Sequence, residues 1–183
     1  MSNRYSNAVK YMQMPNIPKQ VLNELADFAD YNKSPVLSFH PNMARDNAML
    51  QEFTGKRLFD RHKNKFKPEF KYALWLASNK QCAYCGKKLQ NSVESRVDHF
   101  EPKSRFDNEH INNYVCACVL CNTIKGNADI EEFRFRFAFY NSDFRGVVSP
   151  SQAISLINMG IEFPVETELF HFEKFIITGE NHE

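Results

Sequence analysis

The sequence predicts an α+β fold that is organised around a zinc-bound core between residues 80 and 130. Two Cys-x-x-Cys pairs predict the zinc site, and apolar residues at helical spacing before the first pair predict an N-terminal helical region. The chain has 183 residues, of which 43% are hydrophobic, so one domain with a sizeable core is expected. We therefore divide the chain into a helical region (1–79), the core (80–130) and a C-terminal cap packed on the core (131–183).

The zinc site is predicted from four of the five cysteines, which form the pairs Cys82/Cys85 and Cys118/Cys121. Each pair can fold into a tight turn that presents two thiolates, and two such turns complete the tetrahedral sulfur shell that Zn²⁺ prefers. The alternative is a pair of redox sites, although a redox dithiol needs only one Cys-x-x-Cys. The gap over residues 86–117 exceeds the ~15–20 residues of a simple zinc ribbon, so further structure is expected between the two pairs.

The core is predicted to contain two strands followed by a helix. We expect a strand over residues 93–99, a loop over residues 101–113, a second strand over residues 114–118, and a helix from Cys118 or Cys121 to about Ile130. The first strand ends on Asp98 and His99, so these two side chains lie next to the loop.

The motif set in this core resembles that of a nuclease family. The order Cys-x-x-Cys, Asp-His, Asn, Cys-x-x-Cys-Asn-x-x-Lys, over about residues 80–127, resembles the HNH endonucleases with a zinc-bound ββα-metal core. Carried over by position, the three letters of the motif are His99, Asn113 and Asn122. Asn122 departs from the family's final histidine. The resemblance implies hydrolysis of DNA phosphodiester bonds with a divalent metal ion, leaving 5′-phosphate and 3′-hydroxyl ends.

The residue types at these positions suit that chemistry. The imidazole of His99 can accept a proton from water near neutral pH, as a general base does. The carboxylate of Asp98 and the amide oxygen of Asn122 are hard donors that suit a single Mg²⁺ or Mn²⁺ ion. We expect Asn113 to hold the loop that orients His99. The alternative for the Asp-His pair is an ordinary surface loop.

Positive charge is concentrated in one part of the chain, although the formal net charge is only +1. Residues 56–71 carry seven lysines and arginines against Asp60 and Glu69, which permits a local phosphate-binding face. The candidate nucleic-acid contacts are Arg61, Lys63 and Lys65 in this run, Lys103 and Arg105 in the loop after His99, and Lys125 on the core helix. The alternative for this run and for Lys125 is a solvated surface.

Helices and one aromatic strand are expected outside the core. The helices are predicted over residues 19–31, 42–60, 66–79 and 150–159, whereas residues 165–178 fit either a strand or a helix. Four phenylalanines alternate with arginines over residues 132–140, which predicts a strand whose aromatic face is buried or stacks on bases. Trp75 has the same two alternatives, core packing or base stacking.

Several functions and partners stay open at this level. The segment Asp98-His-Phe-Glu-Pro-Lys103-Ser resembles HNH effectors of anti-phage systems of the Septu and retron-associated kind. The alternative role is that of a restriction endonuclease. A catalytically silent zinc module that binds nucleic acid or protein, and an RNA nuclease, are the competing functions. DNA is the expected partner, with a defence-system protein or a second copy of the chain as further alternatives.

Compartment is inferred from the cysteines and from hydropathy. Thiolate ligands and a spare thiol, Cys116, suit a reducing compartment, and Cys116 is interpreted as a small buried hydrophobe. No apolar run approaches the length that crosses a membrane, so we expect a cytoplasmic protein with no membrane contact.

Overall fold

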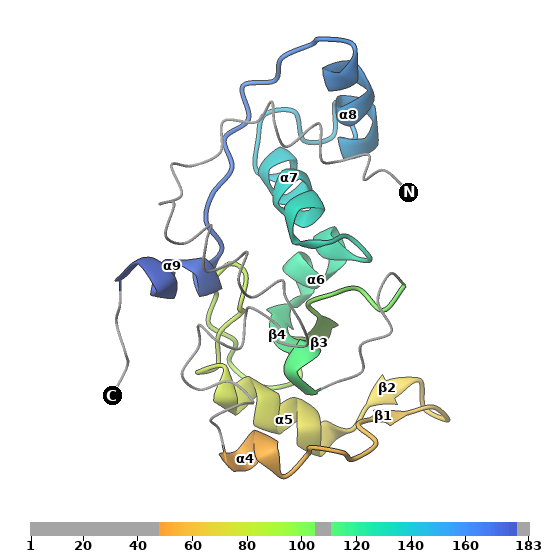
Figure 1. Cartoon of the computed structure of the whole chain (residues 1–183), viewed down its shortest axis with the longest axis vertical. Coiled ribbons are helices and arrows are strands. Elements are labelled where there is room, and N and C mark those ends of the chain that lie inside the picture. Colours follow the sequence, from red (N-terminus) through yellow and green to blue (C-terminus); the bar gives the residue numbers. More distant parts are fainter. Residues whose placement is uncertain (1–47, 105–110, 179–183) are drawn as a thin grey trace.

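The computed structural model describes residues 48–104 and 111–178, which form a mixed arrangement of helices and two small sheets (Figure 1). In chain order the elements are α4 (Ala48–Gln51), β1 (Phe59–Asp60), β2 (Lys65–Phe66), α5 (Pro68–Ala77), β3 (Ser95–His99), the 3₁₀ turn η1 (Ile111–Asn113), β4 (Tyr114–Cys118), α6 (Val119–Lys125), α7 (Ile130–Tyr140), α8 (Pro150–Asn158) and α9 (His171–Thr178). The predicted α+β class is confirmed. The helix expected over residues 19–31 lies outside the described residues.

The core is the predicted succession of two strands and a helix. β3 pairs antiparallel with β4, from Ser95 opposite Cys118 to His99 opposite Tyr114, and α6 starts directly after β4. Every residue of β4 is buried, which is why this strand is apolar throughout. The helix ends earlier than expected, because Gly126 adopts φ +53° and closes α6 at Lys125.

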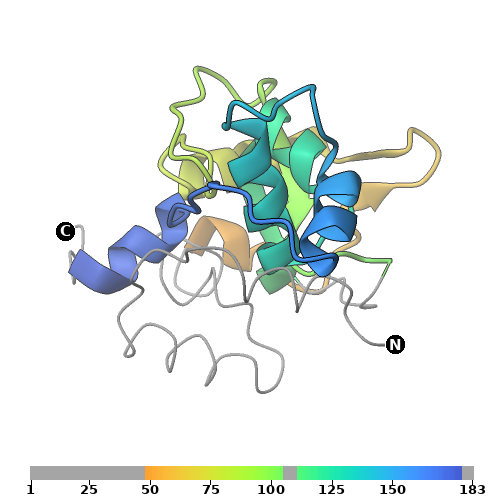
Figure 2. The same cartoon turned by 90° about the horizontal axis from the view of Figure 1, so that it is seen from above.

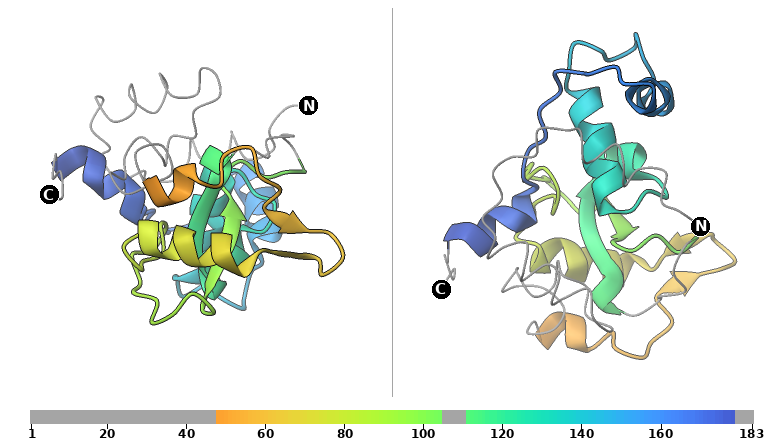
Figure 3. Two further views of the ribbon diagram at one scale, coloured as in Figure 1. Left: turned by 90° about the horizontal axis from the view of Figure 1, so that it is seen from below. Right: turned by 45° about the horizontal axis from the view of Figure 1, so that its top comes forward.

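Helix α5 packs under the β3–β4 sheet, as the view from below shows (Figure 3). Pro68 occupies its first turn, where the missing N–H costs no hydrogen bond, and the buried face includes Phe70 and Leu74. Trp75 is also buried, and its indole N–H donates to the carbonyl of Leu89 at 3.0 Å. Trp75 is therefore a core residue rather than a base-stacking platform.

The helix predicted over residues 42–60 is wrong for most of its described part. Only α4 is helical, and Gly55 turns the chain at φ +72° toward a β-hairpin made of β1 and β2. Phe59 and Phe66 face each other across this hairpin with ring centroids 5.2 Å apart. This cross-strand aromatic pair stabilises strand pairing, and Gly55 separates it from the residues of α4. The hairpin projects beyond the helices (Figure 2).

The strand predicted over residues 132–140 is also wrong, because this segment is helix α7. Asp129 caps the helix by accepting from the backbone N–H of Glu132 at 2.8 Å. Phe133 packs into the main core, whereas Phe135 and Phe139 belong to a second core shared with α8. A helix that is buried on two sides shows apolar residues at every second position, which imitates the period of a strand.

The C-terminal part of the chain packs on the rest of the fold through two helices. Helix α8 matches its prediction and carries a capping box between Ser149 and Gln152, and residues 171–178 form α9. The buried guanidinium of Arg134 on α7 forms an ion pair with the buried carboxylate of Glu173 on α9. This pair fixes α9 against the core. In the described ranges, no helix has the length and apolar character that crossing a bilayer requires.

Candidate active site

The four paired cysteines meet at one point of the structure. The Sγ atoms of Cys82, Cys85, Cys118 and Cys121 all lie within 4.8 Å of one another, and those of Cys85 and Cys118 are 3.9 Å apart. A zinc ion at ~2.3 Å from each sulfur requires neighbouring sulfurs about 3.8 Å apart. The cluster therefore fits a tetrahedral zinc ion.

Local backbone geometry builds each half of the cluster. In the first turn, Gly86 adopts φ +72° and its N–H donates to the carbonyl of Cys82 at 2.9 Å. In the second turn, the sulfur of Cys118 caps α6 by accepting from the N–H of Cys121 at 3.3 Å. Cys82 and Cys121 are fully buried, so two of the four thiolates are sealed inside the core.

The first zinc turn is held by backbone hydrogen bonds from two distant segments. The N–H of Ala83 donates to the carbonyl of Cys116 on β4 at 2.8 Å. From the other side, the N–H groups of His171 and Phe172 donate to the carbonyls of Tyr84 and Ala83 at 2.7 and 3.0 Å. The C-terminal segment thus supports the first Cys-x-x-Cys turn, although it lies some 50 residues beyond the last cysteine.

His99 ends β3 with its ring on the face of the sheet that α5 and the hairpin cover. The ring meets Tyr114 edge-to-face, with centroids 4.9 Å apart, and lies 6.0 Å from the ring of Phe66. His99 as a whole residue is partly exposed, whereas its Nε2 atom is buried. These two aromatic rings therefore fix the orientation of the imidazole.

Asn113 fixes the backbone that follows His99. Its side-chain oxygen accepts from the N–H of Glu101 at 2.8 Å, and its amide group donates to the carbonyl of Glu101 at 3.0 Å. Its own carbonyl accepts from the N–H of Phe100 at 2.8 Å. The fully buried Asn113 thus holds the first residues of the loop by hydrogen bonds, as the sequence predicts.

Asp98 points to the opposite face of the sheet, and there the structure differs from the prediction. Its Oδ2 accepts from the hydroxyl of Tyr84 at 2.6 Å and lies 3.1 Å from Nζ of Lys125. Burial raises the pKa of the Asp98 carboxyl, and the neighbouring Lys125 and Tyr84 act in the opposite direction. A buried carboxylate engaged in this way is not an open ligand for a catalytic ion.

The prediction that Lys125 contacts phosphate is wrong. This lysine is fully buried, and its ammonium donates to the carbonyl of His99 at 2.6 Å in addition to its ion pair with Asp98. Lys125 thus ties α6 to the end of β3. Asn122, one turn earlier on α6, is partly exposed. Of the two predicted oxygen ligands, Asp98 and Asn122, only Asn122 is outside the buried ion pair.

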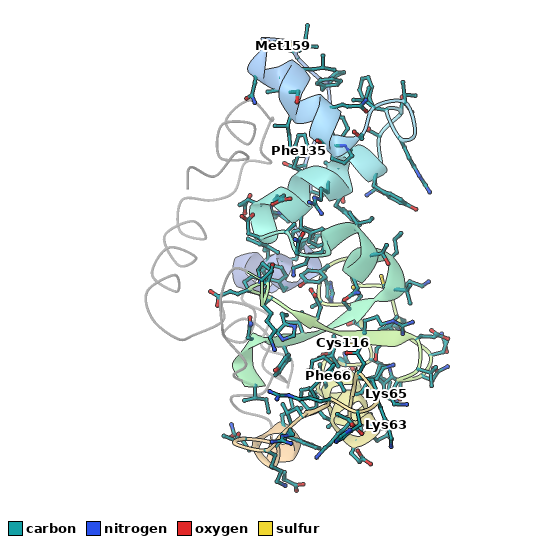
Figure 4. All side chains as sticks on the ribbon, turned by 90° about the vertical axis from the view of Figure 1, so that its right-hand side faces the viewer. Lys63, Lys65, Phe66, Cys116, Phe135 and Met159 are labelled. Carbon is teal, nitrogen blue, oxygen red and sulfur yellow. The ribbon has the colours of Figure 1, made fainter. Side chains whose placement is uncertain are left out.

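The other predicted nucleic-acid contacts lie on the surface. Arg61, Lys63 and Lys65 are exposed on the β1–β2 hairpin, and Lys103 is exposed in the loop after β3. Figure 4 shows Lys63 and Lys65 beside Phe66, the residue that contacts the His99 ring. Arg105 lies outside the described residues.

Two residues of this site were missed by sequence reasoning. Tyr84 occupies a variable position of the first Cys-x-x-Cys turn, and Phe66 lies more than 30 residues before His99. A tyrosine between two zinc ligands is a recognisable signal for a buried hydroxyl that needs an acceptor. No local pattern identifies Phe66, because its role depends on the hairpin.

Replacing Lys125 by methionine is expected to destabilise the fold by about 3–5 kcal/mol, because it leaves the buried Asp98 charge without its partner. The loss should be largest at neutral pH. Burial already raises the pKa of Asp98, so the folded variant binds a proton more readily than the unfolded chain, and its deficit shrinks as the pH falls.

Urea unfolding of the zinc-loaded proteins at pH 7.5 and 5.5 measures this deficit. Combining Lys125→Met with Asp98→Asn should recover most of the stability, because no buried charge is then left unpaired. The exposed Lys88→Met serves as the matched control. Equal unfolding of the Lys125 and Lys88 variants would contradict a stabilising role for the buried pair.

The comparisons with known proteins agree with the geometry of the core. A family model described as HNH endonuclease matches residues 82–128, which contain both cysteine pairs, β3, β4 and α6. No curated protein and no solved structure matches the chain. Residues 82–128 therefore form a domain of the HNH endonuclease family.

Proposed function

We propose that this protein hydrolyses phosphodiester bonds of DNA, with His99 as the general base. The observation that carries the proposal is the placement of His99. Its ring is fixed by Tyr114 and Phe66, the backbone after it is clasped by Asn113, and a basic hairpin lies alongside. A base whose orientation is fixed suits proton abstraction from a water molecule.

The chain's own residues supply three parts of such a reaction. His99 accepts the proton of the attacking water. The contact from Lys125 to the His99 carbonyl and the clasp by Asn113 hold the base at a constant position. The exposed cations of the hairpin bind the flanking backbone phosphates of the substrate.

A divalent ion is part of the proposal, and Asn122 is the residue that would contribute to holding it. Mg²⁺ keeps several water molecules and takes oxygen ligands from substrate phosphates, so one amide oxygen can contribute to its site when DNA is bound. Such an ion stabilises the negative charge that develops at the reacting phosphate. Asp98 would join it only by giving up its ion pair with Lys125.

The zinc-loaded protein is expected to nick supercoiled plasmid only after Mg²⁺ or Mn²⁺ is added, because the charged transition state then has its counter-ion. Agarose electrophoresis over time measures the conversion to open circles. Binding without nicking under any of these ions would favour the silent zinc module. Cleavage of labelled RNA with intact plasmid would favour an RNA nuclease.

The hairpin is proposed as the surface on which duplex DNA docks. Arg61, Lys63 and Lys65 are exposed around a turn that extends from the protein, and Phe66 at its base contacts the His99 ring. A duplex bound along this hairpin therefore passes close to the general base. Asp60 offsets part of the charge through its ion pair with Lys63 at 3.8 Å.

Replacing Arg61, Lys63 and Lys65 together by glutamine should weaken binding to all duplex sequences alike. Each lost phosphate contact lowers the slope of log K against log salt by ~0.9, so the triple variant is expected to lose up to about 2.7. Fluorescence anisotropy across a salt series measures both quantities. A Lys87→Gln/Lys88→Gln variant at another exposed site is the control, and identical slopes for both proteins would place the duplex elsewhere.

The biological setting that we propose is restriction or anti-phage defence. Its support is the phrase from Asp98 to Lys103 and the nuclease family of residues 82–128. Plaque counts on cells that express the parent or a His99→Ala protein test this setting, and equal counts across a phage panel would oppose it.

A further inference from the structure

A hollow lies between the basic hairpin, α5 and the start of β3. Its volume is about 450 Å³, and its lining includes Phe59 and Phe66 of the hairpin, Lys71 of α5, and Arg96 and Val97 of β3. None of its described lining residues is acidic, whereas Lys65, Lys71 and Arg96 are basic. The hollow is therefore a positively charged recess.

Two of these cations converge on a single acceptor. Nζ of Lys71 donates to the carbonyl oxygen of Val93 at 3.2 Å, and Nη1 of Arg96 donates to the same oxygen at 3.0 Å. Arg96 also donates to the carbonyl of Ser95 at 2.9 Å. One neutral carbonyl shared by two positive charges does not balance them, so this corner of the recess favours an anion.

The pKa of Lys71 responds to the same crowding of positive charge. Its pKa is lowered by partial burial and next by the positive charge of Arg96. An anion between the two cations would reverse the effect of Arg96, because each cation would then face an opposite charge.

The recess lies on the same side of the sheet as the general base. Val97 and His99 are two residues apart on β3, so their side chains share a face and are separated by about 7 Å. Phe66 lines the recess and also contacts the His99 ring, and Figure 4 shows it below the strand that carries Cys116. A nucleic-acid strand that leaves His99 along this face therefore meets the recess.

We propose that the recess binds one backbone phosphate of the DNA strand that is cut at His99, through Lys71 and Arg96. This inference rests on the proposed function and assigns residues that the motif does not include. The planar guanidinium of Arg96 can pair with two phosphate oxygens while Lys71 acts as a point charge. Phe59 and Phe66 offer an apolar wall to the adjoining sugar. Because phosphate contacts position without reading sequence, the site sets the register of the strand relative to His99.

The test compares duplex binding by four full-length, zinc-loaded proteins that all carry His99→Ala to prevent cleavage. They are this background alone, the Lys71→Gln/Arg96→Gln variant, an Arg96→Gln variant, and the exposed-site control Lys88→Gln. Anisotropy of a labelled duplex is recorded across a salt series. Zinc content and thermal unfolding confirm that each protein is folded, and glutamine at position 96 keeps a donor for the Val93 carbonyl.

If Lys71 and Arg96 bind the same phosphate, the changes in salt slope and in affinity can be predicted. The double variant should lose about 0.9 from the salt slope, and its affinity should fall roughly tenfold to hundredfold, as for loss of charge-assisted hydrogen bonds. Arg96→Gln alone should lose less, since Lys71 still pairs with the same phosphate. A slope loss near 1.8 would mean two separate phosphates and would overturn the shared site.

Failure of this inference can be told from failure of the proposed function. Binding by the double variant that equals the Lys88→Gln control overturns the recess as a phosphate site, whatever the parent cleaves. A parent with intact His99 that binds duplex but never nicks it overturns only the function. A background protein that does not bind duplex overturns both.

Discussion

Replacing Cys121 by serine is expected to remove zinc and unfold the core together. Structural zinc contributes ~10–16 kcal/mol in small metal-folded peptides, and domains are typically stable by only about 5–15 kcal/mol. Cys121 is fully buried in the first turn of α6, and its N–H donates to the sulfur of Cys118, which caps the helix. Loss of this thiolate therefore removes a buried ligand. The zinc content and the circular dichroism signal of the folded protein should both fall, and they should fall together.

Cys116 provides the matched control for this experiment. It is equally buried, on β4 between the two zinc turns, but its sulfur does not belong to the cluster. Burial raises the pKa of its thiol to about 12, so it stays protonated at neutral pH. Cys116→Ser should keep its zinc and most of its structure. A Cys121→Ser protein that holds one zinc per chain and melts with the parent would show that the cluster does not stabilise the fold.

Replacing His99 by alanine is expected to lower cleavage by ~10²–10⁴-fold, the usual contribution of a general base. Zinc and fold should be retained, because His99 lies at the end of β3 and does not belong to the cysteine cluster. Cleavage by the parent should also decline at acidic pH, as the imidazole takes up a proton and can no longer act as a base.

Added imidazole offers a further measurement on the same variant. The space left by the ring is walled by Tyr114 and Phe66, so a free imidazole molecule can occupy it. The four-thiolate zinc site has no open position for such a ligand. Partial recovery of nicking with imidazole supports the base, whereas nicking at the parent rate by His99→Ala would remove His99 from the mechanism.

The centre of the fold was predictable because its signals are local. The cysteine spacing defines two turns, and the apolar run before Cys118 gives β4 with both of its predicted ends. The Ser149-Pro150 pair likewise places the start of α8. In each case, the residues that specify the element lie within it or directly beside it.

The errors arise where the deciding partner is distant in the sequence. Phe133 and Phe135 of α7 point into different cores, and only the presence of both cores separates this helix from a strand. Arg134 is buried because Glu173, 39 residues later, pairs with it. Lys125 is buried in the same way, through its ion pair with Asp98. Its position on the core helix suggested a phosphate contact, but its role is structural.

The backbone bonds from His171 and Phe172 to the first zinc turn also bear on the order in which this protein matures. A ribosome releases the cysteines well before residues 170–173, so the emerging chain can present all four thiolates while the turn that carries Cys82 still lacks its outer support. Phe170 and Phe172, which cover Tyr84, arrive at the same late stage. The first cysteine turn would thus gain this outer support only when synthesis has passed residues 170–173.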